Sequence, residues 1–197
     1  MQHLAIFASG SGSNARCILE HCARLPQVRV ALIVTNRPDA GVLQHAATFQ
    51  VPTCIIDRSY FYDSEALLGE LHAHAVDFIA LAGFLWLVPP YLTTAFPDRI
   101  LNIHPALLPK YGGPGMYGKH VHRAVKAAGE YESGITIHLV NERYDEGRIL
   151  FQAKTALAPT DDPTQIAQKV LALEHRHYPS VLTDYIARVT AAKISPT

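Results

Sequence analysis

Short apolar runs and helical patterns alternate along the first hundred residues of the chain. Continuous apolar runs predict strands buried on both faces, and apolar positions repeated every three or four residues predict helices that cover them. The predicted strands are residues 3–8, 28–35, 53–56, 78–82 and 98–104, and the predicted helices are residues 13–23, 39–49, 62–75 and 89–95. This alternation predicts right-handed crossovers and an α/β fold with a doubly wound, mainly parallel sheet.

The pattern changes in the second half of the chain. Residues 111–118 contain four glycines and a proline, which predicts an irregular, mobile loop. A helix is predicted at residues 119–128, followed by strands at 132–140 and 148–153 that the loop 141–147 joins into a C-terminal antiparallel hairpin. A final helix is predicted from a cap at residues 160–163 to about residue 178, with a last segment to residue 188. No repeat or linker divides the pattern, so a single domain over residues 1–197 is expected.

Composition excludes several classes of protein. Of 197 residues, 49% are hydrophobic and only 17% are charged, below the usual ~25%, with 17 basic and 17 acidic side chains. No basic run indicates a nucleic-acid surface, and the apolar run at the amino terminus is too short for a signal peptide or a membrane span. A cytoplasmic protein is therefore expected. Cys17, Cys22 and Cys54 lack metal-ligand or redox spacing and are interpreted as reduced thiols.

The most informative chemistry lies at the end of the predicted strand near the middle of the chain. Side chains alternate along a strand, so Asn102 and His104 share one face. Pro105 has no amide hydrogen and ends the strand, which places this polar pair at the carboxyl edge, where open parallel sheets bind ligands. An Asn amide can donate to a developing oxyanion, and a His can carry a proton near neutral pH. A strand that simply ends in polar residues is the alternative.

A glycine-rich turn at residues 9–15 follows the first predicted strand and opens the first predicted helix. Glycine lets backbone amides approach an anion closely, Ser13 and Asn14 add donors, and the start of a helix favours a phosphate. The turn also matches the dinucleotide pattern G-x-G-x-x-G/A, but the acid expected about 20 residues later is absent, and Arg37 lies near that place. A P-loop is excluded because its Lys-Ser/Thr ending is missing. An ordinary Gly-Ser turn is the remaining alternative.

Two further stretches gain a function only from their position in the fold. Asp145 lies in the predicted hairpin loop, where an acid is ordinarily a turn former. If the hairpin lies beside the central strand, this carboxylate faces His104 and raises the pKa of the imidazole. Residues 82–88 continue an apolar run beyond a buried strand, which indicates core or a wall that offers backbone groups to a flat heterocycle.

Together these stretches resemble the folate-dependent formyltransferases. The resemblance rests on Leu101-Asn102-Ile103-His104-Pro105 with Leu107-Leu108-Pro109-Lys110-Tyr111, and on residues 10–14, 82–84, 134–138 and 145–147. It covers nearly the whole chain, from the first strand to Glu174, in the family's order and rough spacing. It implies a Rossmann-like formyltransferase fold that binds phosphate in the half at about residues 1–100 and binds folate and carries catalysis in the half at about 101–197.

The resemblance also implies a reaction. A formyl group is transferred from 10-formyltetrahydrofolate, a co-substrate, to the amine of glycinamide ribonucleotide in purine synthesis, and no metal is needed. By position, Asn102, His104 and Asp145 match the family's catalytic trio. Asn102 and protonated His104 would stabilise the tetrahedral oxyanion, and Asp145 would set the charge of His104.

The binding roles are carried over in the same way. Gly12, Ser13 and Asn14 match contacts to the substrate phosphate, and Glu174 matches an acid that meets the ribose. The loop that holds the pterin is matched by Leu85, Trp86, Leu87 and Val88, with Asn102 beside it. The implied partners are these two small molecules, without nucleic acid or membrane, and the implied assembly is a monomer or homodimer.

The chain departs from the family at two positions that bear on the folate. Relatives often have arginines where this chain has Ser64 and Trp86, and both arginines are associated with the acidic tail of the folate. Fewer fixed cations are therefore expected to face that tail, with little gain from extra glutamates. The glycine-rich segment from Gly112 to Gly118 also differs from the commoner, shorter version and is interpreted as a lid.

Four competing interpretations remain at this point. An NAD(P)-dependent oxidoreductase is supported by the first loop and opposed by the missing ribose acid. A formyltetrahydrofolate hydrolase shares the trio but is expected to carry an additional regulatory domain. A formyltransferase directed at tRNA would need an added domain and a basic surface. A phosphosugar-binding module without chemistry is opposed by the presence of all three members of the trio.

Overall fold

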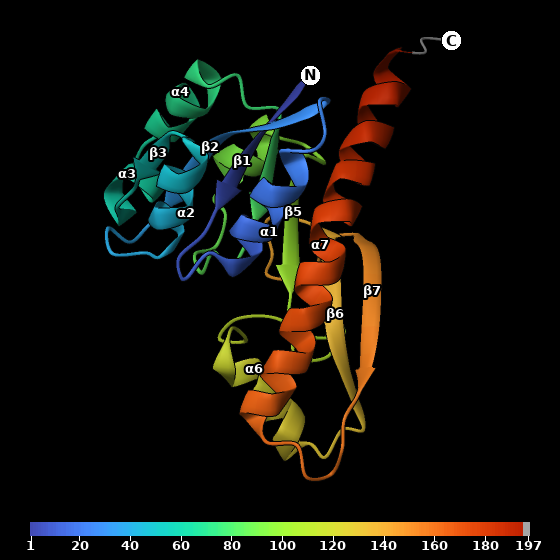
Figure 1. The fold of residues 1–197 in the computed structure, drawn as a ribbon. Coiled ribbons are helices and arrows are strands. Elements are labelled where there is room, and N and C mark those ends of the chain that lie inside the picture. The colour runs from blue at the N-terminus through green and yellow to red at the C-terminus, as the bar shows by residue number, and fades with distance from the viewer. Residues whose placement is uncertain (195–197) are drawn as a thin grey trace.

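A seven-stranded mixed sheet forms the centre of the protein, which a computed structural model describes over residues 1–194. The strands are β1 (Gln2–Phe7), β2 (Val28–Thr35), β3 (Thr53–Ile55), β4 (Phe78–Leu81), β5 (Ile100–His104), β6 (Glu132–Leu139) and β7 (Ile149–Ala156). Their order is β3-β2-β1-β4-β5-β6-β7, parallel from β3 to β5 and antiparallel at β6 and β7 (Figure 1). The predicted doubly wound α/β fold with a C-terminal antiparallel hairpin is confirmed.

Helices cover both faces of this sheet. They are α1 (Ser13–Cys22), α2 (Val42–Phe49), α3 (Arg58–Tyr62), α4 (Ala66–Ala73), α5 (Pro90–Ala95), α6 (Lys119–Ala127) and α7 (Pro163–Ile194). Buried residues of α1, α2, α6 and α7 share one core cluster, whereas those of α3, α4 and α5 share the cluster on the opposite face. The long helix α7 runs beside β6 and β7 (Figure 1).

The strand order reverses at β1, and this reversal positions the site. From β1 the chain passes first to β2 and β3 on one side, and then returns to β4 and β5 on the other. The loops that leave β1 and β4 therefore diverge and open a crevice at their carboxyl ends, the usual ligand position in such sheets.

The predicted helix at residues 62–75 corresponds to α4, which begins only at Ala66, and a separate short helix, α3, precedes it. Asp57 caps α3 by accepting the Tyr60 amide at 2.7 Å. Between the helices, the Ser64 hydroxyl donates to the Tyr60 carbonyl at 3.0 Å and accepts the Ala66 amide at 3.4 Å. Because a serine side chain takes over hydrogen bonds that a continuous helix would make through its backbone, the helix breaks there.

The predicted final helix and last segment form one continuous helix, α7, despite Pro179 in its interior. An interior proline costs about 3 kcal/mol because it removes a hydrogen bond and crowds the preceding turn. Burial offsets this cost: Tyr178 and Leu182, on either side of Pro179, are fully buried. The Tyr178 hydroxyl also lies 3.0 Å from the carbonyl of Leu81 and 3.1 Å from that of Leu101, so it ties α7 to β4 and β5.

Candidate active site

A cavity of about 740 Å³ lies at the carboxyl ends of β1, β4 and β5. Nearly all the residues singled out in the sequence line it, although they come from distant parts of the chain: Ser13, Asn14, Leu85, Trp86, Leu87, Val88, Asn102, His104, Asp145 and Glu174. Gly12 does not line the cavity and packs behind the loop against Val42 of α2. The fold therefore assembles the predicted anion loop, polar pair, hairpin acid and apolar wall around one space.

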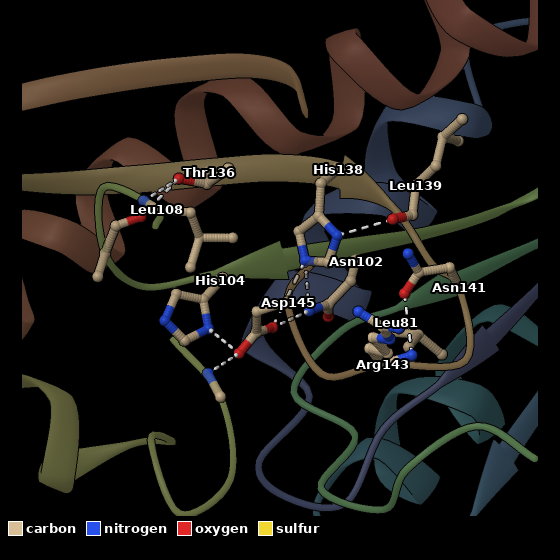
Figure 2. A network of polar contacts seen from close by, with 12 residues as sticks. Leu81, Asn102, His104, Leu108, Thr136, His138, Leu139, Asn141, Arg143 and Asp145 are labelled. Atoms are coloured by element: carbon tan, nitrogen blue, oxygen red, sulfur yellow. Dashed lines mark hydrogen bonds and ion pairs between the residues drawn. The ribbon is translucent and has the colours of Figure 1, made fainter. Parts of the chain in front are cut away.

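The register of β5 and β6 explains the central group of side chains. Asn102 lies opposite His138, and His104 lies opposite Thr136. The Thr136 hydroxyl accepts the Leu108 amide at 3.0 Å and donates to the Ala106 carbonyl at 2.7 Å. This hydroxyl fixes the turn that follows His104 (Figure 2).

Asp145 reaches this group from the loop between β6 and β7. Its backbone has φ +57°, a left-handed conformation that Asp tolerates better than most residues. Two residues later, a side chain at Gly147 would come 1.7 Å from the Leu139 carbonyl oxygen, so only glycine permits this close approach. The local sequence thus turns the chain tightly enough to point the carboxylate back at β5.

The Asp145 carboxylate bridges four groups (Figure 2). Oδ2 lies 3.4 Å from Nδ1 of His104 and accepts the Gly113 amide at 3.0 Å. Oδ1 lies 3.6 Å from Nε2 of His138 and 3.5 Å from Nδ2 of Asn102. The expected contact between Asp145 and His104 is therefore present.

The Asp145 carboxylate raises the pKa of His104, as predicted, but the net shift is in the opposite direction. Burial of the ring, which is 4% exposed, lowers the pKa of His104 below the usual value of an imidazole. The Asp145 carboxylate and the hydrogen bond to the Tyr111 carbonyl oppose this shift but are outweighed. The net direction depends on the cost of burying a charge, which the sequence near His104 does not reveal.

Both ring nitrogens of His104 face acceptors. Nε2 lies 2.8 Å from the Tyr111 carbonyl oxygen, and Nδ1 faces Asp145. A neutral imidazole has one N–H and satisfies one of these acceptors, whereas an imidazolium satisfies both. An imidazolium would therefore have a partner for each N–H, while burial of the ring favours the neutral form.

His138 is a member of this network to which the sequence argument gave no role. Its Nδ1 lies 2.8 Å from the Leu139 carbonyl and donates to it, so Nε2 accepts from the Asn102 amide nitrogen at 3.1 Å. His138 thereby orients the Asn102 amide. The signal was available in the alternation of residues 134–138, where Thr136 and His138 share a face, but its use required the register with β5.

The predicted anion loop joins β1 to α1 as expected. Gly12 has φ +75°, which favours glycine, and it directly precedes the first residue of α1. Ser9 connects this loop to the loop after β4, because its amide donates to the Gly83 carbonyl and its hydroxyl accepts the Leu85 amide, both at 3.1 Å. Ser13 and Asn14, the first residues of α1, thus line the cavity together with the apolar wall.

Asn14 and Glu174 form a buried pair at the anion loop. The Asn14 amide nitrogen donates to Glu174 Oε2 at 2.6 Å. Burial raises the pKa of the Glu174 carboxyl above its usual value, and the bond from Asn14 opposes this shift. Within residues 1–194, the buried Asn14 Oδ1 has no hydrogen-bond partner, so it is free to accept from a bound ligand.

Other residues that line the cavity were not singled out in the sequence as individual site residues, although two of them belong to the segment interpreted as a lid. Met116 and Tyr117 come from the glycine-rich segment, Lys119 and His122 from α6, and Arg143 from the hairpin loop. His122 is buried, and burial lowers its pKa. Residues 113–118 reach the cavity because Asp145 holds the Gly113 amide, a contact between distant segments that local patterns do not indicate.

The described residues show neither a metal-binding cluster nor a membrane-spanning helix. Residues 1–194 contain no cluster of three or more His, Cys, Asp or Glu side chains placed to hold a metal ion. The same residues form no helix that is long and apolar enough to span a membrane.

Comparisons with known proteins show the family to which the chain belongs. Residues 2–182 match the family described as formyl transferase. The chain is 44% identical over 185 residues to the chloroplastic phosphoribosylglycinamide formyltransferase of Arabidopsis thaliana, across 91% of this chain and 63% of that protein. The Haemophilus influenzae phosphoribosylglycinamide formyltransferase is 36% identical over 92% of this chain and 86% of its own length.

The two plant relatives are longer than this chain, and solved structures of relatives share its fold. The chain spans 63% and 59% of two plant relatives, from Arabidopsis thaliana and Vigna unguiculata. The solved phosphoribosylglycinamide formyltransferase from Bacillus halodurans superposes with a TM-score of 0.85 at 34% identity, covering 95% of this chain and 97% of that one. Glycinamide ribonucleotide transformylase 1 from Symbiobacterium toebii gives a TM-score of 0.83 at 36% identity, covering 92% and 86%.

Proposed function

Because the chain belongs to the formyl transferase family, we propose that it transfers a formyl group from 10-formyltetrahydrofolate to the amine of glycinamide ribonucleotide, a step of purine biosynthesis. The observation that carries this proposal is that one cavity joins an anion loop, at Ser13 and Asn14, to the polar network of Asn102, His104 and Asp145. A ligand with a phosphate at one end and a reactive amine at the other suits such a space.

The ribonucleotide is assigned to the side of the cavity that β1 and α7 form. Its phosphate binds the amides at the start of α1 together with Ser13 and Asn14, where Gly12 allows the tight turn. Its ribose hydroxyls bind Glu174 and the free Asn14 Oδ1. Support comes from the burial of both side chains and from the unsatisfied oxygen.

The folate is assigned to the wall formed by Leu85, Trp86, Leu87 and Val88. This wall combines an exposed apolar side chain, Leu85, with a half-buried indole. Such a surface, with backbone groups between the side chains, suits a flat heterocycle that has hydrogen-bonding edges. Asn102 lies between the two assigned ligands, where the formyl carbon must meet the amine.

The chemistry follows from the protonation of His104. The amine attacks the formyl carbon, which gives a tetrahedral intermediate with a positive nitrogen and an oxyanion. Neutral His104 takes the proton from that nitrogen on Nε2, which leaves the Tyr111 carbonyl to reach the substrate, while Nδ1–H donates to Asp145. The imidazolium and the Asn102 amide stabilise the oxyanion, and the proton finally passes to the folate nitrogen as the C–N bond breaks.

The test is an assay of purified protein with the two substrates, followed by mass spectrometry of the ribonucleotide. We expect a mass gain of one formyl group for one folate consumed. Release of formate without the ribonucleotide would instead indicate a hydrolase. Saturable binding of NADH in calorimetry, without binding of the ribonucleotide, would contradict the proposal and favour an oxidoreductase.

A further inference from the structure

A cluster of aromatic side chains packs against Trp86 in the folate wall. Trp86, which lines the cavity, packs against the buried Phe61 at 5.5 Å and against Phe84 at 6.1 Å between ring centroids. Tyr62 lies 5.9 Å from Trp86 and donates a hydrogen bond of 3.1 Å to the Leu87 carbonyl. The indole is therefore held by contacts with three aromatic side chains.

Arg58, the first residue of α3, lies over this cluster. Its guanidinium carbon is 5.2 Å from the centroid of the Tyr62 ring and 5.5 Å from that of Trp86, distances typical of cation–π contacts. The neighbouring Asp57 uses its carboxylate to cap α3. Among residues 1–194, no acidic side chain forms an ion pair with Arg58.

The other cations around the cavity are paired or distant. Arg37 pairs with Asp39 at 3.1 Å, and Arg143 pairs with Glu146 at 3.2 Å. Lys119 begins α6, which lies well apart from α3 in the fold (Figure 1). Arg58 is thus an exposed guanidinium over Trp86, which lines the cavity, and it has no acidic partner among residues 1–194.

We propose that Arg58, stacked on Tyr62 and Trp86, binds a carboxylate at the end of the folate tail. This assignment rests on the proposed function for the identity of the ligand, since a folate bound by its heterocycle at residues 85–88 carries its glutamate carboxylates outward. A guanidinium offers a planar pair of N–H donors that matches a carboxylate, and stacking on two rings holds this plane in place.

The assignment revises what the sequence suggested about the tail. Ser64 and Trp86 stand where arginines are often found, and fewer cations were expected there. In the structure, Arg58 of α3 supplies one guanidinium, which lies over the ring of Trp86. One guanidinium pairs with one carboxylate, so most of the binding gain comes from the first glutamate and little from further ones.

The experiment compares two ligands in two proteins. Calorimetry measures the Kd of folate, and of folate diamide with both glutamate carboxylates converted to amides, for the wild type and for Arg58→Gln. Because the contact is exposed, we expect Arg58→Gln to weaken folate binding about two- to tenfold and to leave diamide binding unchanged. Arg58→Lys keeps the charge without the planar fork and should fall between the two.

Kinetics and a matched control complete the test. Arg58→Gln should raise the KM for 10-formyltetrahydrofolate by the same factor, while kcat and the KM for the ribonucleotide stay unchanged. Arg188→Gln removes another guanidinium that lies over a ring, 5.7 Å from the Tyr185 centroid on α7, and should change none of these values.

Two results would overturn the assignment of Arg58: equal folate Kd values in the wild type and Arg58→Gln, or an equal loss of folate and diamide binding. The second result would mean that Arg58 only supports the rings. Absence of formyl transfer by the wild type would overturn the proposed function instead, and the binding comparison would still decide on Arg58.

Discussion

His104 combines a buried ring with two acceptors, and its titration is the first testable consequence. Burial holds its pKa below about 6.5, the ordinary imidazole value, while Asp145 opposes this shift. Asp145→Asn removes the opposing charge, so the pKa of His104 should fall further in that variant. NMR titration of the His104 ring measures both values. A wild-type pKa above about 6.5, or a rise in the variant, would contradict the prediction.

The lowered pKa of His104 also determines the direction in which stability changes with pH. Below about pH 6.5 the unfolded chain binds a proton on this histidine more readily than the folded protein does. The contribution of neutral His104 to folding is therefore complete above about pH 6.5 and is lost as the pH falls toward the folded-state pKa. Urea unfolding of the wild type and of His104→Gln between pH 5 and 8 isolates this contribution.

The proposed catalytic trio predicts non-additive kinetic losses. Removing one oxyanion donor typically costs about 10²–10³ in kcat, so Asn102→Ala should lose at least that much, and His104→Ala a similar factor. His104 and Asp145 serve one proton transfer, so the double variant should lose little more than the worse single variant. A double loss equal to the product of the single losses would show that the two residues act independently.

The sequence predicts part of this site because part of it is local. Alternation along a strand and the stop at Pro105 suffice to place Asn102 and His104 together. The contact of His138 with Asn102 depends on the register of β6, and the direction of the His104 pKa depends on how completely other segments bury the ring. Neither the register of β6 nor the burial of the ring can be read from the residues near His104 in the sequence.

At the scale of an element, the turn from β1 into α1 makes a prediction about Gly12. A side chain there would come 2.7 Å from the Cα and Cβ atoms of Val42, at a backbone φ of +75°. Gly12→Val should therefore displace the turn and raise the KM for the ribonucleotide much more than the KM for the folate. Steady-state kinetics with each substrate varied in turn measures the difference.

A glycine elsewhere provides the control for this variant. A side chain at Gly69, on α4, meets nothing within 4 Å, so Gly69→Val should leave both KM values unchanged. Circular dichroism and thermal unfolding establish whether each variant folds. An equal rise of both KM values in Gly12→Val would show a general distortion and would remove the support for an anion loop.

Element types were predicted well because apolar periodicity is a local property. Errors arose where a side chain or a tertiary contact outweighed the pattern. The Ser64 hydroxyl replaces backbone hydrogen bonds between α3, which was not predicted, and α4, which begins four residues later than predicted. Burial of Tyr178 and Leu182 carries α7 through Pro179, a residue that usually stops a helix.

At the scale of the whole molecule, Tyr178 connects α7 to the sheet between the two halves of the site. Its hydroxyl lies within hydrogen-bond distance of the Leu81 and Leu101 carbonyls, which are buried. Tyr178→Phe leaves both without this partner and should lower the free energy of unfolding by about 1–3 kcal/mol. Urea unfolding measures the change.

Tyr185 offers a comparison on the same helix. Its hydroxyl donates at 2.9 Å to the Asp98 carbonyl, before β5, and is only partly buried. Tyr185→Phe should therefore cost less than Tyr178→Phe, because water can replace a partner at the surface. The reverse order would show that the bonds of Tyr178 do not carry the connection.

The contact between Asp145 and the Gly113 amide links the glycine-rich segment to a group proposed for proton transfer. His104 and Asp145 bind Tyr111 and Gly113, so the two groups proposed for proton transfer also hold the glycine-rich segment in place. A displacement of that segment would break both contacts and would leave the His104 ring with Asp145 but without the Tyr111 carbonyl. We therefore expect proton transfer at His104 to depend on the position of the glycine-rich segment.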